Sequence, residues 1–353
     1  MDKPNPRHNS ISLFRILNLY LLVIFHLQSG FPFFSSLGIR LGWYFSTFFF
    51  FIVSGYLLYS GFIDNPDRYK SGAAYTLSRL KRIYPYLIVS YVPIVAFRIF
   101  RDGLKETMYF IGSNFWEFLC LQGIGLNHGW NWFNNSLWFI SVMLICGFIL
   151  YHCLVKWHDT FVNFVLPLLI IVIVSYLFRA HADLSSAMGV QGFYGNFALL
   201  MGFVAMGLGI YSRKLTVYIQ SKVSDTLPLR IVGFLLLLII PAVTTFKAFS
   251  EKDFLYLFID FVGISLCFLA SNNRLFGSPF IQKWAGLTLY IYLAHMFWAD
   301  YLLAYLIPNT SDLVSNILII LSCIVLSTIG GILLKVITDW LLKLLHIDIR
   351  KRS

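Results

Sequence analysis

Charged residues are scarce in this chain of 353 residues. Asp, Glu, Lys and Arg together account for 12% of it and hydrophobic residues for 58%, whereas about a quarter of a typical soluble domain is charged. So little charge cannot cover a surface that faces water, which excludes an ordinary soluble globular protein. The outer surface of the fold must therefore meet lipid.

Cysteine is also sparse, and its spacing excludes two classes of protein. The five cysteines include no C-x-x-C pair and no combination with histidine that has the spacing of a metal site. The sequence therefore predicts neither a structural metal nor a disulfide framework.

Long apolar runs are what the chain has in abundance. A helix needs roughly 20 apolar residues to cross a bilayer, and about ten runs approach this length. They are residues 11–28, 43–59, 83–100, 137–154, 161–178, 193–211, 231–246, 254–270, 287–306 and 313–334. We therefore expect an all-α, polytopic integral membrane bundle of about ten transmembrane helices. It should form a single domain over residues 1–353, with short tails at about 1–10 and 340–353.

So many spans leave no room for a soluble catalytic domain, and any chemistry must lie inside the bundle. The longest connection, residues 101–136, contains ETMYFIGSNFWEFLCLQ. Its aromatic and aliphatic residues recur at roughly helical spacing between polar residues. This pattern predicts a helix that lies in the membrane interface.

The basic residues are distributed unevenly between the two sides. With the N-terminus inside, the inner segments hold 19 of the 27 Lys and Arg residues, which predicts that both termini are cytoplasmic. The net charge of +11 then describes a cytoplasmic face beside anionic lipid headgroups. The charge is spread over several loops, which argues against nucleic-acid binding. We expect a multi-pass protein of the cell (inner or plasma) membrane.

Two ionisable residues, Arg15 and His26, stand in the first apolar run. On a helix they are ~16 Å apart along the axis, and their directions around the axis differ by only about 20°. They therefore share one face. Ionisable residues within a membrane usually serve a function. The alternative is that the arginine extends to the headgroups and the histidine bonds to a carbonyl in the core.

Two further motifs place polar residues near the inner side. In FFFFIVSGYLLY, Ser54 and Tyr56 flank a glycine that permits close helix packing. In LSRLKRIYPYLIVSY, Arg79 and Arg82 lie one turn apart and can share a phosphate or diphosphate. Packing is the alternative for the first motif, and topology anchoring is the alternative for the second.

Taken in order, these motifs resemble the acyltransferase family 3 membrane proteins. The matching elements are Arg15 with His26, F-F-x-x-S-G-Y at 50–56, R-x-x-R-I-x-P at 79–85, L-W-F at 137–139 and LTLYIYLAHMF at 287–297. The resemblance covers roughly residues 10–340. It implies transfer of an acyl group, most often acetyl, from cytoplasmic acyl-CoA to a hydroxyl of a surface carbohydrate. Such acceptors include O-antigen of lipopolysaccharide, capsule, peptidoglycan, exopolysaccharide and their lipid-linked precursors.

The resemblance also implies roles for individual residues. His26 and Arg15 would be required for transfer, and Arg79 and Arg82 would belong to the acyl-CoA side, where we also place Ser54 and Tyr56. Coenzyme A carries its phosphates at one end and its thioester at the other, which suits arginines at the mouth and an imidazole deep inside.

The chain departs from the family pattern at two positions. Many members have an aspartate where this chain has Ser12, and one branch has W-S-[LV]-x-x-E where this chain reads WFISVM. The departures affect the acceptor and the fine mechanism.

The mechanism that we expect is general base catalysis by a neutral His26, which would take the proton of the attacking hydroxyl. A covalent acyl-histidine, or an acyl-serine on Ser54, is the alternative. Trp138, Tyr292 and His295 are candidates for the acceptor side or for the lining of the cavity. We expect acyl-CoA as the donor and no metal.

Two other classes of function are compatible with a polytopic bundle. A transporter or flippase for an envelope glycan or a small anion would use helices that break within the membrane, and Pro85, Pro93, Pro167 and Pro241 offer places for such breaks. A protein that only assembles with partners would need no histidine in its first span.

Overall fold

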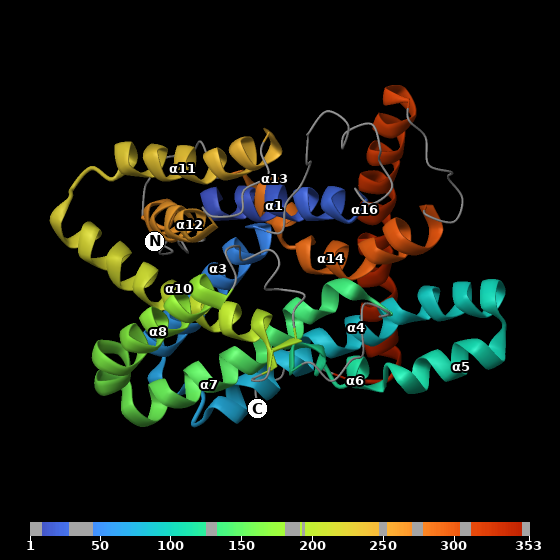
Figure 1. Ribbon diagram of the computed structural model, residues 1–353, viewed down its shortest axis with the longest axis horizontal. Coiled ribbons are helices and arrows are strands. Elements are labelled where there is room, and N and C mark those ends of the chain that lie inside the picture. Colours follow the sequence, from blue (N-terminus) through green and yellow to red (C-terminus); the bar gives the residue numbers. More distant parts are fainter. Residues whose placement is uncertain are drawn as a thin grey trace.

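The computed structural model describes residues 9–27, 45–124, 133–180, 191–192, 195–246, 253–269, 278–303 and 312–347, and these residues form a helical bundle (Figure 1). Its α-helices are α1 (Asn9–Leu27), α3 (Phe45–Asp64), α4 (Gly72–Asp102), α5 (Leu104–Ser113), α6 (Phe115–Phe118), α7 (Trp138–Thr160), α8 (Leu166–Ala180), α10 (Phe197–Lys222), α11 (Leu227–Phe246), α12 (Asp253–Cys267), α13 (Pro279–Ala285), α14 (Thr288–Met296) and α16 (Leu313–Leu344). The remaining elements are the 3-10 turns η2 (Pro66–Arg68), η3 (Gln122–Ile124) and η4 (Asn135–Leu137), the π-helices η5 (Phe161–Val165) and η7 (Phe297–Leu303), and the paired two-residue strands β1 (Gln191–Gly192) and β2 (Gly195–Asn196).

Several of these helices are long and apolar enough to cross a bilayer. Five meet this criterion within the described part of the chain, namely Thr47–Asp64, Gly72–Asp102, Trp138–Arg179, Phe197–Lys222 and Leu313–Leu344. Shorter apolar helices cover Ile11–Leu27, Leu227–Ala242 and Leu255–Cys267. The predicted all-α polytopic membrane bundle is confirmed, whereas the count of ten spans is not.

Two parts of the predicted pattern do not form separate straight helices. Residues 137–154 and 161–178 belong to one helical stretch, which bends at Trp157, where φ is −143° and ψ is 43°, and continues through η5 into α8. The run at 287–306 is divided between the nine-residue α14 and the π-helix η7. Apolar runs predict burial in lipid, but they do not predict where a helix bends.

The prolines do not break the helices in which they lie. α4 continues through Pro85 and Pro93 for 31 residues, and α11 continues through Pro241. Membrane helices tolerate proline because neighbouring helices and local adjustments satisfy the freed carbonyl groups. The helices therefore do not break at Pro85, Pro93 or Pro241. Pro167 is the second residue of α8 and lies directly after the π-helix η5, so this predicted position does coincide with an irregular stretch.

The core has two parts, and α1 contributes to both. The first consists mainly of buried residues from α3, α7, α10 and α12, together with Ile11 and Phe14 at the start of α1. The second combines α4, α14 and α16 with Leu19, Leu22 and Val23 further along α1. Figure 1 shows α1 beside α12 and α13 at one end and near α14 and α16 at the other.

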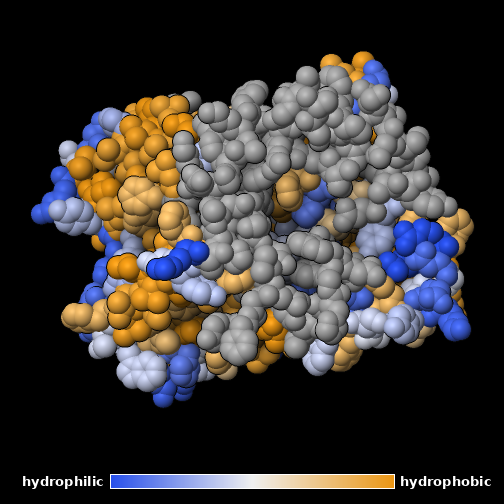
Figure 2. All heavy atoms as spheres, viewed as in Figure 1, coloured by the Kyte–Doolittle hydropathy of each residue, from blue (hydrophilic) through white to orange (hydrophobic). Residues whose placement is uncertain are grey.

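Apolar side chains also cover much of the outside. Figure 2 shows hydrophobic surface over α11 and α8 at the left of the view. Exposed side chains on these two helices include Ile231, Val232 and Leu235 on α11 and Ile171 and Val172 on α8. An exposed apolar surface of this extent on a helical bundle fits contact with lipid.

The closest backbone approach in the first part of the core is between α3 and α10. A Cβ atom added at Gly55 would lie 2.0 Å from the carbonyl oxygen of Met206, and one added at Gly209 would lie 2.2 Å from that of Ile52. Glycines at such positions let two membrane helices touch along their backbones, where van der Waals packing stabilises the pair.

We expect Gly55→Ala to lower the free energy of unfolding by about 1–3 kcal/mol, because its methyl group must push the two backbones apart. Gly61→Ala is the matched control, because Gly61 lies on the same helix and a Cβ atom added there would meet nothing within 4 Å. Thermal unfolding of the purified proteins in detergent checks this. Equal midpoints for the two variants would contradict close packing at Gly55.

Candidate functional site

Arg15 lies half-buried on α1 and contacts the start of α14. Its Nη2 atom donates a hydrogen bond to Oγ1 of Thr288 over 3.1 Å, and the Thr288 hydroxyl donates in turn to the carbonyl of Ala285 over 2.8 Å. Thr288 is the first residue of α14. The guanidinium is therefore held inside the bundle at the junction of α13 and α14.

Further along the same pair of helices, His26 meets His295. The two imidazole centroids are 5.2 Å apart and the rings are tilted by 48°. His26 is half-buried, whereas His295 is fully buried. Since Arg15 and His26 both contact α14, they lie on one face of α1.

His295 is oriented by its own helix. Its Nδ1 atom lies 2.5 Å from the carbonyl oxygen of Tyr292, and since a carbonyl only accepts, Nδ1 carries the proton in this contact. Nε2 is then the basic nitrogen, and it is buried without a partner among the residues that the structure describes. A buried acceptor nitrogen beside a second imidazole can accept a hydrogen bond from it.

The L-W-F segment packs against α14 beside the histidines. The Tyr292 hydroxyl donates to the carbonyl of Ser136, and its ring lies 6.0 Å from that of Phe139. Trp138 is half-buried and contacts Phe51 at a centroid distance of 6.2 Å. The structure thus brings Tyr292 and His295 together, and it places Trp138 at the start of α7, next to the residue that contacts Tyr292.

Ser54 and Tyr56 lie in different surroundings. The Ser54 hydroxyl donates to the carbonyl of Phe50 over 2.7 Å and lies 3.6 Å from the sulfur of Met143. Tyr56 stacks on Phe268 with centroids 3.7 Å apart. Tyr56 therefore belongs to the packing between α3 and α12.

Arg79 and Arg82 form a separate basic cluster with a third arginine, Arg68. The Arg68 guanidinium lies 5.2 Å from the centre of the Tyr69 ring, and the Tyr69 hydroxyl bonds to Ser78 over 3.0 Å. Partial burial raises the pKa of Tyr69, but the Ser78 bond and the positive charges of the three arginines outweigh it and leave the pKa below its ordinary value. The field at this end of α4 therefore favours an anion.

Arg79 is the most enclosed member of this cluster. Its guanidinium lies 5.2 Å from the centre of the Tyr75 ring, and its Nε atom is buried without a hydrogen-bond partner in the described structure. Arg82 is exposed. Sequence reasoning missed Arg68, although a basic residue in the short connection before an arginine pair was an available signal.

The predicted residues thus fall into two groups. Arg15, His26, Tyr292 and His295 meet along α1 and α14, whereas Arg79 and Arg82 cluster with Arg68 at the start of α4. No hydrogen bond, ion pair or ring contact links the two groups within the described residues.

Comparison with known proteins decides the class. A family model described as an acyltransferase domain, Acyl_transf_3, matches residues 8–336. The chain belongs to this acyltransferase family. The match covers both groups of residues and nearly the whole chain, so the bundle is a membrane acyltransferase. Comparisons with curated proteins and with solved structures found no match.

We expect Thr288→Val to lower the rate of acyl transfer about tenfold, because it removes the acceptor that holds a charged donor on Arg15. Thr288→Ser keeps the hydroxyl and should retain most of the rate. The initial rate per folded molecule measures both. Equal rates for the two variants would show that the orientation of Arg15 does not matter for transfer.

Proposed function

We propose that this membrane acyltransferase moves an acyl group, with acetyl as our choice, from cytoplasmic acyl-CoA to a hydroxyl of a cell-envelope polysaccharide or its lipid-linked precursor. In this proposal it lies in the cell membrane with both termini cytoplasmic. The observation that carries the proposal is the pair of imidazoles, His26 and His295, inside a helical bundle of an acyltransferase family.

The chemistry follows from the exposure of the two histidines. His26 is half-buried and can reach a substrate, whereas His295 is enclosed. As the acceptor oxygen attacks the thioester carbonyl, its proton passes to the neutral imidazole of His26, and the new ester bond forms. The thiolate of coenzyme A then leaves and takes that proton. In this proposal His295 stays neutral. Its ring holds His26 in place and lowers the free-energy cost of the positive charge that His26 carries transiently.

The arginine cluster supports a phosphate-bearing donor. Three guanidiniums near one tyrosine, one of them with an unpartnered buried nitrogen, suit the phosphates of coenzyme A. Under our proposal the donor lies with its phosphates at Arg68, Arg79 and Arg82 and its thioester toward His26. Arg15 lies ~16 Å from His26 along α1, so in this proposal it binds a part of the donor away from the thioester.

The acceptor side is assigned to the aromatic residues near the start of α7. Trp138 is half-buried and lies beside Phe139, which contacts Tyr292. Aromatic faces pack well against the apolar faces of sugar rings. A glycan hydroxyl bound there would enter the site next to the histidines.

We expect His26→Ala to abolish acylation of the surface glycan while leaving the amount of protein in the membrane near normal, because the lost imidazole accepts the proton and its removal leaves only a small cavity. Mass spectrometry of the glycan measures the loss of the acetyl or succinyl mass shift. His152→Ala, at another half-buried histidine on α7, is the control. Normal acylation in the His26 variant would remove this histidine from catalysis.

We expect Arg68→Ala, Arg79→Ala and Arg82→Ala each to raise the KM for acyl-CoA about tenfold, since each removes a charged contact to a phosphate. Lys81→Ala removes an equal charge from an exposed neighbour and should leave KM unchanged. Steady-state kinetics with purified enzyme in detergent measures the difference. If all four variants bind the donor alike, the arginines serve only to anchor the topology.

A further inference from the structure

A buried carboxylate holds the segment that precedes α7. Glu117, the third residue of α6, is fully buried in the connection between α4 and α7. Its two carboxylate oxygens accept hydrogen bonds from the backbone amides of Phe133 and Asn134, over 2.8 and 3.2 Å. Burying a carboxylate costs free energy, so its place here needs a compensating role.

The hydrogen bonds to Glu117 oppose the effect of its burial. Burial raises its pKa to about 7, even though the hydrogen bonds from Phe133 and Asn134 act in the opposite direction. Only the ionised carboxylate presents acceptors on both oxygens with no proton of its own.

The segment that Glu117 holds is also bonded to α14 and η7. The Tyr301 hydroxyl donates to the carbonyl of Phe133 over 2.7 Å, and the Asn134 side-chain amide donates to that of Leu293 over 3.2 Å. Tyr292 donates to the carbonyl of Ser136. Residues 133–136 therefore lie between the carboxylate on one side and the helix that carries His295 on the other.

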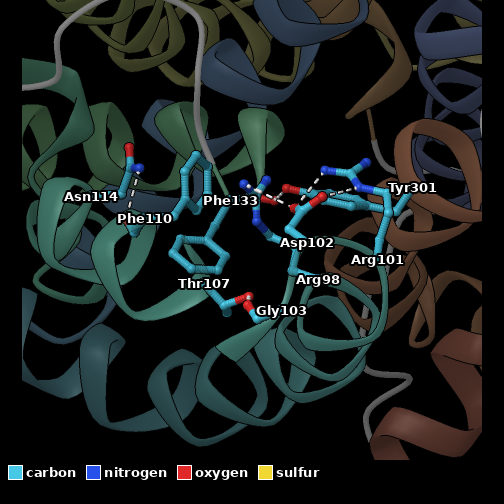
Figure 3. A network of polar contacts seen from close by, with 9 residues as sticks. All are labelled: Arg98, Arg101, Asp102, Gly103, Thr107, Phe110, Asn114, Phe133 and Tyr301. Carbon is cyan, nitrogen blue, oxygen red and sulfur yellow. Dashed lines mark hydrogen bonds and ion pairs between the residues drawn. The ribbon is translucent and has the colours of Figure 1, made fainter. Parts of the chain in front are cut away.

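The side chain of Phe133 gives this segment a rigid support. Its ring lies 4.6 Å from that of Phe110, and Arg98 places its guanidinium 3.5 Å from the centre of the Phe110 ring. Figure 3 shows Phe133 beside Phe110, with Arg98 and its partner Asp102 near them and the Tyr301 side chain approaching from η7. The ring of Phe133 is thus held by aromatic packing. Its backbone amide and carbonyl are held by Glu117 and Tyr301.

The line of contacts ends at the histidine pair. Tyr292 uses its hydroxyl to bond Ser136 and its carbonyl to orient Nδ1 of His295, whose ring packs on His26. A shift of residues 133–136 would therefore move Tyr292 and Leu293, and with them the ring of His295.

We infer that Glu117 is a positioning residue for the His26–His295 pair, acting through residues 133–136 and α14. The inference rests on the proposed function for its catalytic readout, because it assumes that this pair handles the proton. It assigns no contact between Glu117 and the substrate.

The test compares Glu117→Gln with Glu106→Gln, which makes the same change at an exposed position of α5. Glutamine keeps the size but turns an NH₂ group toward one of the two amides, so one hydrogen bond is lost. In the purified full-length enzyme we expect kcat to fall about ten- to a hundredfold in Glu117→Gln, with the KM for acyl-CoA unchanged. Glu117→Asp keeps both acceptor oxygens on a shorter side chain, so its kcat should lie between those of Glu117→Gln and Glu106→Gln.

Hydrogen exchange provides a readout that does not depend on activity. We expect amide exchange in Glu117→Gln to become faster at residues 133–137 and also at 290–296, and to stay unchanged in Glu106→Gln. Faster exchange at 133–137 alone, with wild-type kcat, would reduce Glu117 to a local structural role and overturn the inference.

The two proposals fail in different ways. If His26→Ala retained activity, the proposed function would be contradicted. Hydrogen exchange at 290–296 in Glu117→Gln would still test whether Glu117 acts on α14. If Glu117→Gln does not fold, the same measurements on Glu117→Asp apply, and wild-type kcat and exchange in that variant would overturn the inference.

Discussion

The contact between α1 and α14 is the interaction on which the candidate site depends. It brings Arg15 to Thr288 and His26 to His295, two polar contacts that lie along one pair of helices. Inside a bilayer no water is available to solvate these groups, so each must find a partner within the bundle. α1 also contributes to both parts of the core, which keeps this contact in register with the rest of the fold.

The site is supported from outside the spanning helices as well. In the connection between α4 and α7, the buried carboxylate of Glu117 and the ring of Phe110 hold residues 133 and 134 in place. A helix as short as α14 has little stability of its own. Contacts with α1, α16 and this connection therefore decide where its side chains point.

The basic cluster and the histidine pair present opposite chemistry. The first gathers positive charge at the start of α4, where the pKa of Tyr69 is lowered. The second holds two imidazole rings beside aromatic side chains. Such a division suits a donor that is highly charged at one end and reactive at the other, which is the reason that acyl-CoA is our proposal.

Much of this could be predicted from the sequence, because composition and helical periodicity act locally. The shortage of charge determined a membrane protein, and the spacing of Arg15 and His26 put them on one helix face before any tertiary contact was known. Tertiary structure alone decided that His295 faces His26 and that Glu117 holds residues from beyond its own helix. It also decided where the helices bend. Each of these depends on packing between segments far apart in the chain, and the free energy of such contacts leaves no periodic signal in the sequence.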